Sequence, residues 1–189
     1  EIVAMKDKGE FVFLSVARFV PQKNFSLLLR SFAQVHQKEK NVRLVLVGKG
    51  NEESHMRNII AQFQKDTQAA ITILPWSNDV GSLMRSASAY VLSSNYEGWG
   101  RVLIESLVAK LPIVTTKVGC AEEVVIHGEH GLLVPVDNES ELTKAMLELV
   151  TDEALYTYIK SNLNALDSKT LPGTDNGTYA LHWAQIFGE

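Results

Sequence analysis

The sequence predicts an α/β domain with a Rossmann-like, doubly wound parallel sheet. Short apolar runs alternate along the chain with stretches in which apolar residues recur every three or four positions. The connections between them are short, which requires parallel strands joined by right-handed helical crossovers. Because no internal repeat or low-complexity tract interrupts this pattern, we expect one domain over residues 1–189. Its core would cover about 11–150, with closing helices over about 152–188.

The first half of the chain contains three predicted strands. Residues 11–17 are apolar apart from Ser15, as expected of a strand buried on both faces. Asn24 is a suitable N-cap for a helix over about 25–38. The next segments are a strand over 42–47, a helix over about 52–66 and a strand over 71–74.

The second half continues the alternation. Asn78 and Asp79 can cap a short helix to about residue 87, and a central helix begins at about Gly100. The other expected elements are strands over 89–93, 112–115 and 131–134, helices over about 120–126, 138–150 and 152–166, a loop over 171–177 and a last helix over 178–187.

Composition excludes several classes of protein. The chain has 189 residues, 46% of them hydrophobic, which suits one sizeable core. Its net charge of -4 disfavours general binding to nucleic acid or to anionic membranes. Cys120 is the only cysteine, so no internal disulfide can form, as in a reducing compartment. Without a long apolar segment or a signal peptide, we expect a cytoplasmic protein.

The loop before the central helix carries the most informative residues. Gly98 and Gly100 lie just before or at the first helical turn, where free backbone N–H groups and the helix dipole can bind an anion. Glu97 in the loop and Glu105 in the helix can each accept hydrogen bonds from sugar or ribose hydroxyls. A phosphate between two polyols would fit this arrangement. A capping loop followed by an exposed glutamate is the simpler explanation of the stretch taken alone.

Several chemistry-bearing residues follow predicted strands directly. They are Arg18, Gly48, Trp76, Ser94 and Glu97. In a parallel sheet the carboxyl ends of the strands lie at one edge, where ligands of such folds bind. We therefore expect these residues to share one rim, and this favours a binding site over the simpler explanation.

Arg18 and Lys23 lie in one strand-to-helix turn, so that both can reach a diphosphate. The alternative is a surface arginine and a solvated lysine. Gly48 and Gly50 suggest a dinucleotide fingerprint that lacks its third glycine, and they could equally form a simple strand exit. Trp76 could flank a base, although a tryptophan at a strand end is more often buried in a core.

Metal and hydrolase chemistry have no support in the sequence. The five histidines show no metal-ligand spacing, and the motifs of zinc proteases and serine hydrolases do not occur. His127 and His130 bracket a loop, where we expect structural roles. We therefore expect neither a metal site nor a cofactor.

The combined motifs resemble the carboxyl-terminal, donor-binding half of a retaining glycosyltransferase of the GT-B fold, family 4. The resemblance covers about residues 11–152. It is carried by the E-x7-E motif from Glu97 to Glu105, by Arg18 with Lys23, by the turn over 48–50 and by the segment 118–135. Each piece is weak alone, whereas their order and spacing together are specific.

The resemblance implies a role for each residue. Arg18 and Lys23 would hold the donor diphosphate and stabilise the leaving group, and Glu97 would bind the transferred sugar. Glu105 would accept from the ribose, and Trp76 would face the base. The remaining donor-binding positions would be Gly48, Gly50, Gly98, Trp99, Gly100, Arg101, Val102 and Leu103. The donor would be a nucleotide-diphosphate sugar, with no metal and no cofactor.

Three features of the sequence depart from the family pattern. Ala17 and Lys110 stand where the family usually has glycine, which concerns backbone fit. The segment 118–123 carries an additional Glu122, which adds a negative charge near the expected rim.

The resemblance also implies a partner domain. The family's acceptor half precedes the donor half, and 189 residues are too few for both. We therefore expect a domain that binds donor but transfers little alone. The missing domain would bind a glycan, lipid-linked or small-molecule acceptor, and the full-length enzyme could associate peripherally with a membrane. The alternatives are a GT-B-type epimerase or hydrolase, and a non-catalytic nucleotide-binding or interaction module.

Overall fold

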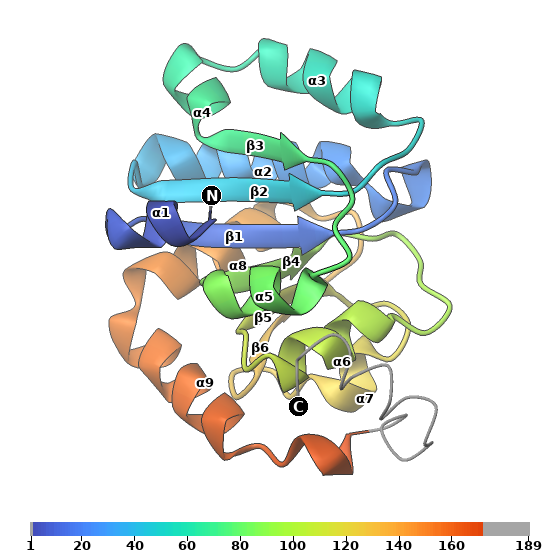
Figure 1. Ribbon diagram of the computed structural model, residues 1–189, viewed down its shortest axis with the longest axis vertical. Coiled ribbons are helices and arrows are strands. Elements are labelled where there is room, and N and C mark those ends of the chain that lie inside the picture. Colours follow the sequence, from blue (N-terminus) through green and yellow to red (C-terminus); the bar gives the residue numbers. More distant parts are fainter. Residues whose placement is uncertain (1, 172–189) are drawn as a thin grey trace.

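A computed structural model describes residues 2–171, and its strands form one parallel sheet in the order β3-β2-β1-β4-β5-β6 (Figure 1). The strands are β1 (Phe11–Val16), β2 (Val42–Val47), β3 (Ile71–Leu74), β4 (Ala89–Leu92), β5 (Ile113–Thr116) and β6 (Gly131–Val134). The helices are α1 (Ile2–Asp7), α2 (Phe25–Lys38), α3 (Glu53–Ala61), α4 (Lys65–Ala69), α5 (Val80–Ser86), α6 (Arg101–Val108), α7 (Ala121–Val124), α8 (Glu139–Thr151) and α9 (Glu153–Ala165).

The sheet is doubly wound. From β1 the chain moves outward to β2 and β3, then returns to the other side of β1 and continues through β4, β5 and β6. Right-handed crossovers in the two directions place the helices on opposite faces. In Figure 1, α2 and α8 lie behind the sheet and α5 and α6 in front of it. The predicted fold class is confirmed, and the strand order reverses between β1 and β4.

The central strands form the core. β1 pairs with all six residues of β2, and the residues of β1 and β4 from Val12 and Ala89 onward are buried. The apolar stripe of α2 packs on this sheet, with Leu28 and Phe32 fully buried. Asn24 caps α2 as predicted, since its side chain accepts a hydrogen bond from the N–H of Leu27. The sheet is therefore a rigid base for the loops at its carboxyl edge.

Two helix predictions were wrong in detail. The single helix expected over 52–66 is broken into α3 and α4. The break occurs where the side-chain amide of Gln68 donates hydrogen bonds to the carbonyl groups of Ala61 and Phe63, and so takes the place of helical N–H donors. The helix expected over 120–126 is reduced to the four residues of α7. Helix α1 was not predicted.

The closing part of the chain is only partly described. Helix α9 matches the helix expected over 152–166, and Asp152 caps it by accepting from the N–H of Leu155. A short 3-10 helix, Ser168–Thr170, follows. The loop expected over 171–177 lies beyond the described residues except for Leu171, and the last helix expected over 178–187 lies wholly outside them.

Lys110 adopts a left-handed conformation, with a φ of 57°, where the family usually has glycine. Its ammonium group donates to the carbonyl oxygen of Leu166, and Lys160 donates to the carbonyl oxygen of Lys110 at 2.7 Å. Burial, with a smaller contribution from the positive charge of Lys6, lowers the pKa of Lys160. These two bonds fix the end of α6 against α9 and hold the strained turn in place.

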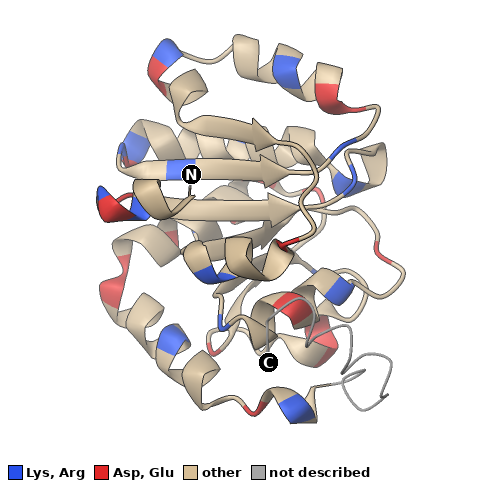
Figure 2. Cartoon of the chain, viewed as in Figure 1, with Lys and Arg blue, Asp and Glu red and all other residues tan. Residues whose placement is uncertain are grey.

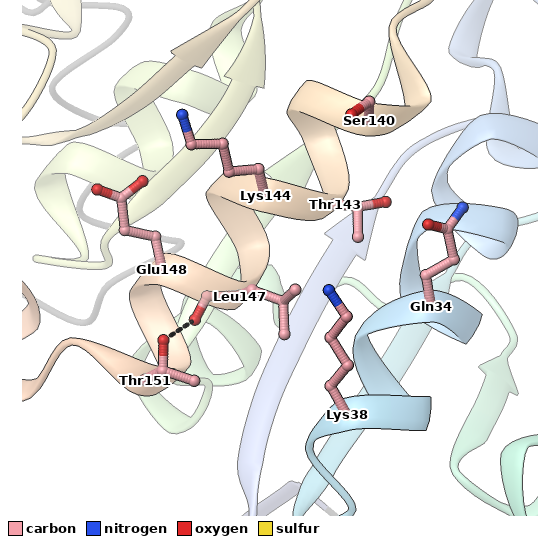
Figure 3. Close-up of a pocket in the computed structure, with 8 residues that line it drawn as sticks. All are labelled: Gln34, Lys38, Ser140, Thr143, Lys144, Leu147, Glu148 and Thr151. Atoms are coloured by element: carbon pink, nitrogen blue, oxygen red, sulfur yellow. Dashed lines mark hydrogen bonds between the residues drawn. The ribbon is translucent and has the colours of Figure 1, made fainter.

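A shallow hollow of about 390 Å³ lies between α2 and α8 (Figure 3). Figure 3 shows Gln34 and Lys38 on α2 opposite Thr143 on α8. The Thr143 hydroxyl is buried and has no partner among the described residues. The side-chain amide of Gln34 donates to the Glu139 carboxylate at 2.5 Å. All of the residues that line the hollow belong to these two helices, so it does not lie at the edge where the strands end.

Candidate functional site

The loops that follow β1 and β4 are joined to each other by several hydrogen bonds. The Ser93 hydroxyl donates to the carbonyl oxygens of Lys23 at 2.9 Å and Asn24 at 3.2 Å. The Asn95 N–H donates to the carbonyl oxygen of Gln22 at 2.9 Å. In return the Gln22 side chain donates to the carbonyl oxygen of Tyr96 at 2.7 Å. The two loops therefore form one unit at the point where the strand order reverses, which is where doubly wound folds bind ligands.

Lys23 and Glu97 meet at the centre of this unit. The Lys23 ammonium lies 2.6 Å from Oε1 of Glu97, and the two side chains are 15% and 8% exposed. The Ser94 hydroxyl donates to the same Oε1 at 2.5 Å. The expectation that the loops after the first and fourth strands share one rim is therefore met for this pair. Charge-assisted bonds of this kind hold Glu97 in one orientation.

Arg18 is exposed at the end of β1, in the same loop as Lys23. The backbone beside it is fixed by the exit of β2, because the N–H of Phe19 donates to the carbonyl oxygen of Lys49 at 2.9 Å. A Cβ on Gly48 would overlap the carbonyl oxygen of Ala17, and one on Gly50 would overlap that of Phe19. Both glycines are thus required by the close packing of two loops.

The turn before α6 is shaped by a second loop. Gly100 is the N-cap of α6 with a φ of 90°, which favours glycine. The N–H of Cys120 donates to the carbonyl oxygen of Trp99 at 2.7 Å. Gly119 has a φ of 55°, and a Cβ there would overlap Trp99 and approach Cβ of Glu97 to 3.0 Å. The 119–120 turn therefore presses the loop containing Glu97 and Trp99 into place.

The first turn of α6 contributes backbone groups to the candidate site more than side chains. Leu103 is fully buried, and its N–H donates to the carbonyl oxygen of Gly100 at 2.9 Å. Leu103 was predicted to bind donor, and this N–H is already used within the turn. Arg101 is exposed, Val102 is partly buried, and Glu105 is half-buried one turn further along. Arg101 and Glu105 thus lie one turn apart on α6, and Glu105 is the more buried of the two.

Trp76 lies in a hollow of about 510 Å³ at the ends of β2 and β3. The tryptophan is 47% exposed, so the expectation that it is more often core does not hold here. The hollow is also lined by Gly48, Lys49, Glu53 and Arg57. The Arg57 guanidinium is paired with Glu53 at 2.7 Å, one turn earlier in α3. An exposed ring beside paired charges can accept a flat aromatic ligand.

Cys120, His127 and His130 have structural surroundings: the thiol is buried, and the imidazole rings contact the backbone. Cys120 is buried, and burial together with the negative charges of Glu123 and Glu97 raises the pKa of its thiol to about 11. Nδ1 of His127 accepts from the N–H of Leu133 at 3.0 Å. His130 is 8% exposed and lies 3.3 Å from a backbone carbonyl oxygen. Within residues 2–171 no three such side chains come together in a way that could hold a metal ion.

Charge at this edge is mixed. Figure 2 shows basic and acidic segments side by side at the edge to which the strand arrows point. The additional Glu122 forms an ion pair with Lys117 at 3.2 Å, so its charge is partly balanced.

Sequence reasoning placed Ser94 on the rim without giving it a role, and it gave no site role to Gly119. The signal for Ser94 was a polar residue at the end of a buried strand, three positions before Glu97. Gly119 was noted as part of a family motif, but its contact with Trp99 depends on packing between distant loops. Asn24 was predicted as a helix cap, and the structure adds its bond to Asn95 at 2.8 Å.

A model of the family described as "Glycosyl transferases group 1" matches residues 3–165 of this chain. The chain belongs to this family. The match includes every element from β1 to α9, and thus the unit around Lys23 and Glu97.

Glycosyltransferases of other organisms have related sequences. An uncharacterized glycosyltransferase of Methanocaldococcus jannaschii is 31% identical over 159 residues, which are 82% of this chain and 43% of the relative. In Campylobacter jejuni, the N-acetylgalactosamine-N,N'-diacetylbacillosaminyl-diphospho-undecaprenol 4-alpha-N-acetylgalactosaminyltransferase is 31% identical over 82% of this chain and 40% of the relative. The chain therefore spans about two fifths of the length of these curated relatives.

Solved glycosyltransferases share the fold. A TarM variant of Staphylococcus aureus, in complex with fondaparinux, alpha-GlcNAc-glycerol and UDP, matches 95% of this chain with a TM-score of 0.79 and 20% identity, over 36% of its own chain. Anabaena HepE in complex with UDP-glucose matches 89% with a TM-score of 0.78 and 24% identity, over 47% of its chain. The six-stranded α/β architecture of the described residues is that of GT-B glycosyltransferase domains.

A carboxyl-terminal domain of a group 1 family protein, LpcC of Francisella tularensis, corresponds to most of this chain. It matches 90% of this chain and 92% of its own, with a TM-score of 0.76 and 18% identity. None of the helices in residues 2–171 has both the length and the hydropathy needed to span a membrane.

Proposed function

We propose that this chain is the donor-binding, carboxyl-terminal domain of a family 4 retaining glycosyltransferase. It binds a nucleotide-diphosphate sugar across the carboxyl edge of the sheet. The sugar lies against Glu97, the diphosphate against Arg18, Lys23 and the start of α6, and the nucleoside towards Trp76. The observation that carries the proposal is the ion pair between Lys23 and Glu97. It joins the loops after β1 and β4, the two strands between which the strand order reverses.

The cations suit a leaving diphosphate. Arg18 presents a planar guanidinium with several donors, and Lys23 has three N–H donors, of which one is sufficient for Glu97. The backbone N–H groups at the start of α6 add partial positive charge. These groups stabilise the negative charge that grows on the diphosphate as the glycosidic bond breaks. Retention would then require neither a bound metal nor a protein nucleophile, with the leaving phosphate accepting the acceptor's proton.

Glu105 and Trp76 are assigned to the nucleoside. Glu105 follows the helix start by one turn, so a ribose attached to a phosphate at that start can place its hydroxyls near the carboxylate. Trp76 offers an exposed ring to the base. UDP is bound by solved neighbours of the same fold, including HepE, and it is the first donor nucleotide to test here.

The proposal extends to the whole enzyme. A hexosyl unit would pass to a glycan, lipid-linked or small-molecule acceptor held by a preceding domain, at the cytoplasmic side of a membrane to which the full enzyme binds peripherally. The chain alone would bind donor and transfer little. No cofactor is required.

An epimerase or hydrolase that uses Glu97 and Glu105 as a catalytic pair is less well supported. Such chemistry needs both carboxyl groups at one bond. Glu97 lies in the loop with Oε1 bound to Lys23 and Ser94, whereas Glu105 is part of α6. Turnover of a nucleotide sugar without acceptor would favour this alternative. A non-catalytic binding module would bind the nucleotide, yet remain inactive in the full-length protein.

The decisive experiment is calorimetric titration of the chain with UDP, GDP and ADP, using wild type and Arg18→Ala. We expect one nucleotide to bind, and the substitution to weaken it by about 1.5 to 3 kcal/mol through loss of charge-assisted bonds. Arg30→Ala is the matched control, because Arg30 on α2 forms a partly exposed ion pair with Glu139 of α8. Unchanged affinity in Arg18→Ala would contradict the diphosphate assignment, and no binding of any nucleotide would contradict the proposed function.

A further inference from the structure

The two oxygens of the Glu97 carboxylate have different surroundings. Oε1 accepts from Lys23 at 2.6 Å and from Ser94 at 2.5 Å. Oε2 has no hydrogen-bond partner among residues 2–171, and it is not among the buried atoms that lack one. An ionised carboxylate can accept about four hydrogen bonds, so the unused capacity lies mainly on Oε2. The carboxylate is thus fastened by one oxygen and offers the other to a ligand.

Ser94 is itself held rigidly. It is fully buried at the end of β4, and its carbonyl oxygen accepts a hydrogen bond from the Thr116 hydroxyl at 2.7 Å, at the end of β5. Because a carboxylate oxygen only accepts, the Ser94 hydroxyl must be the donor in its contact with Glu97. Two neighbouring strands therefore fix the direction from which this donor approaches.

Lys23 is a less constant partner for Glu97. A lysine has a flexible four-carbon stem, and a diphosphate would compete for the Lys23 ammonium group with two or three negative charges. The Ser94 hydroxyl is neutral and short, and it has no such competing ligand. When donor binds, Ser94 therefore remains the contact that maintains the orientation of Glu97.

We propose that Ser94 is a positioning residue for the sugar subsite, which acts by holding Oε1 of Glu97 so that Oε2 accepts a hydroxyl of the donor sugar. This inference rests on the proposed function and adds a residue to the sugar subsite. It concerns the hydroxyl-bearing sugar alone. The nucleoside diphosphate contacts other groups and does not depend on Ser94.

The test is a comparison of two ligands on one variant. Ser94→Ala and wild type are titrated with UDP and with UDP-glucose, or with the GDP or ADP pair if the wild-type chain selects that base. We expect the affinity for the nucleotide sugar to fall about tenfold, the scale of one hydrogen bond to a charged group, while the affinity for the free diphosphate stays within twofold. Ser106→Ala is the control, because Ser106 is equally buried and donates within α6 to Val102.

Two further variants keep the test decisive. In a Glu97→Gln background, Ser94→Ala should cause little further loss for the nucleotide sugar, because Ser94 acts through the carboxylate. Ser94→Cys replaces the alanine variant if that variant does not fold. Cysteine is close to serine in volume and is a weaker donor, so the affinity of Ser94→Cys for the nucleotide sugar should be lower than that of wild type but higher than that expected for alanine. Equal losses for both ligands, or additive losses with Glu97→Gln, would overturn the positioning role. Failure of the wild type to bind any of the three diphosphates would overturn the proposed function, and this inference with it.

Discussion

The carboxyl edge of the sheet contains two regions of opposite character. The inner rim consists of residues 20–24 and 93–100 with the 119–120 turn, and its contacts are buried and cross-linked. The outer rim is the hollow around Trp76, where an exposed ring and exposed charges surround an open space. The inner rim is organised before any ligand arrives, whereas the side chains of Trp76, Lys49 and Arg57 on the outer rim are exposed to solvent.

The difference follows from the strand order. The inner rim lies between β1 and β4, where two loops leave the sheet in opposite directions and can bond to each other across the gap. The outer rim lies at β3, the last strand on its side, so it has a neighbour on one side only. Within the proposed function, rigidity is located at the sugar and diphosphate, and adaptability at the base. The following predictions test whether this contrast holds.

The largest effect is expected from Gly119→Ala. The new Cβ would lie 2.8 Å from the carbonyl carbon of Trp99 and would add an unfavourable left-handed φ. We expect a loss of about 3 kcal/mol in the free energy of unfolding, measured by urea denaturation, together with loss of nucleotide-sugar binding. Gly98→Ala is the control for stability alone, because nothing lies within 4 Å of its Cβ, whereas Gly98 is itself an expected donor-binding position. Similar losses in the free energy of unfolding for the two variants would show that the inner rim is not tightly packed at Gly119.

The second prediction concerns the Cys120 thiol beneath the inner rim. Burial raises its pKa from 9.0 to about 11, so the folded protein retains a proton that the unfolded chain releases. The stabilisation is fully present below pH 9 and is lost as the pH rises towards 11. We expect urea denaturation to show a loss of about 2 kcal/mol from this group between pH 8 and 10.5. That loss should be absent in Cys120→Ala, and an equal pH dependence in both proteins would refute the assignment.

Lys23→Ala should destabilise the fold by about 1.5 kcal/mol, because it leaves the buried Glu97 carboxylate with one partner fewer. The matched control is Lys40→Ala. Lys40 pairs with Asp66 at 2.7 Å, but both side chains are more than half exposed, so the change should stay below about 0.5 kcal/mol. Thermal denaturation of the two variants measures the difference, and equal shifts in Tm would remove the distinction between inner rim and open surface.

Trp76→Ala should give the smallest change in stability, within about 0.5 kcal/mol, since the ring is half exposed on the outer rim. Calorimetry should nevertheless show nucleotide affinity reduced by about 1 kcal/mol, the lower end of the range for stacking of a base on an aromatic ring. Tyr158→Ala on α9 removes another exposed ring and should change neither quantity. A large loss of stability in Trp76→Ala would place the ring in the core after all.

Local signals were sufficient for most of the fold. The apolar run of β1, the cap at Asn24 and the stripe of α2 are properties of neighbouring residues, and they were predicted correctly. The break between α3 and α4 was missed because it depends on a side chain, Gln68, that reaches back to backbone carbonyls. Such competition between side chain and backbone does not alter the apolar periodicity.

The site was predictable to a coarser level. Knowing that strands are parallel is enough to place Arg18 and Glu97 at one edge, since every carboxyl end lies there. It is not enough to pair Lys23 with Glu97, which are 74 residues apart, or to find that Ser94 binds the same oxygen. The sequence also suggested that Gly48 and Gly50 are glycines because they contact a ligand. The structure gives another reason, which is their close packing against the backbone of Ala17 and Phe19.

The bonds between the loops after β1 and β4 also determine when the site can form during synthesis. Each of those side-chain bonds spans 69 to 74 residues, so Lys23 leaves the ribosome long before Glu97 does. Contacts between residues so far apart in the sequence carry a cost in loop-closure entropy and form slowly. The cross-linked carboxyl edge is therefore a late product of folding, and a nascent chain that stops before β4 contains Lys23 without the Glu97 carboxylate that it contacts.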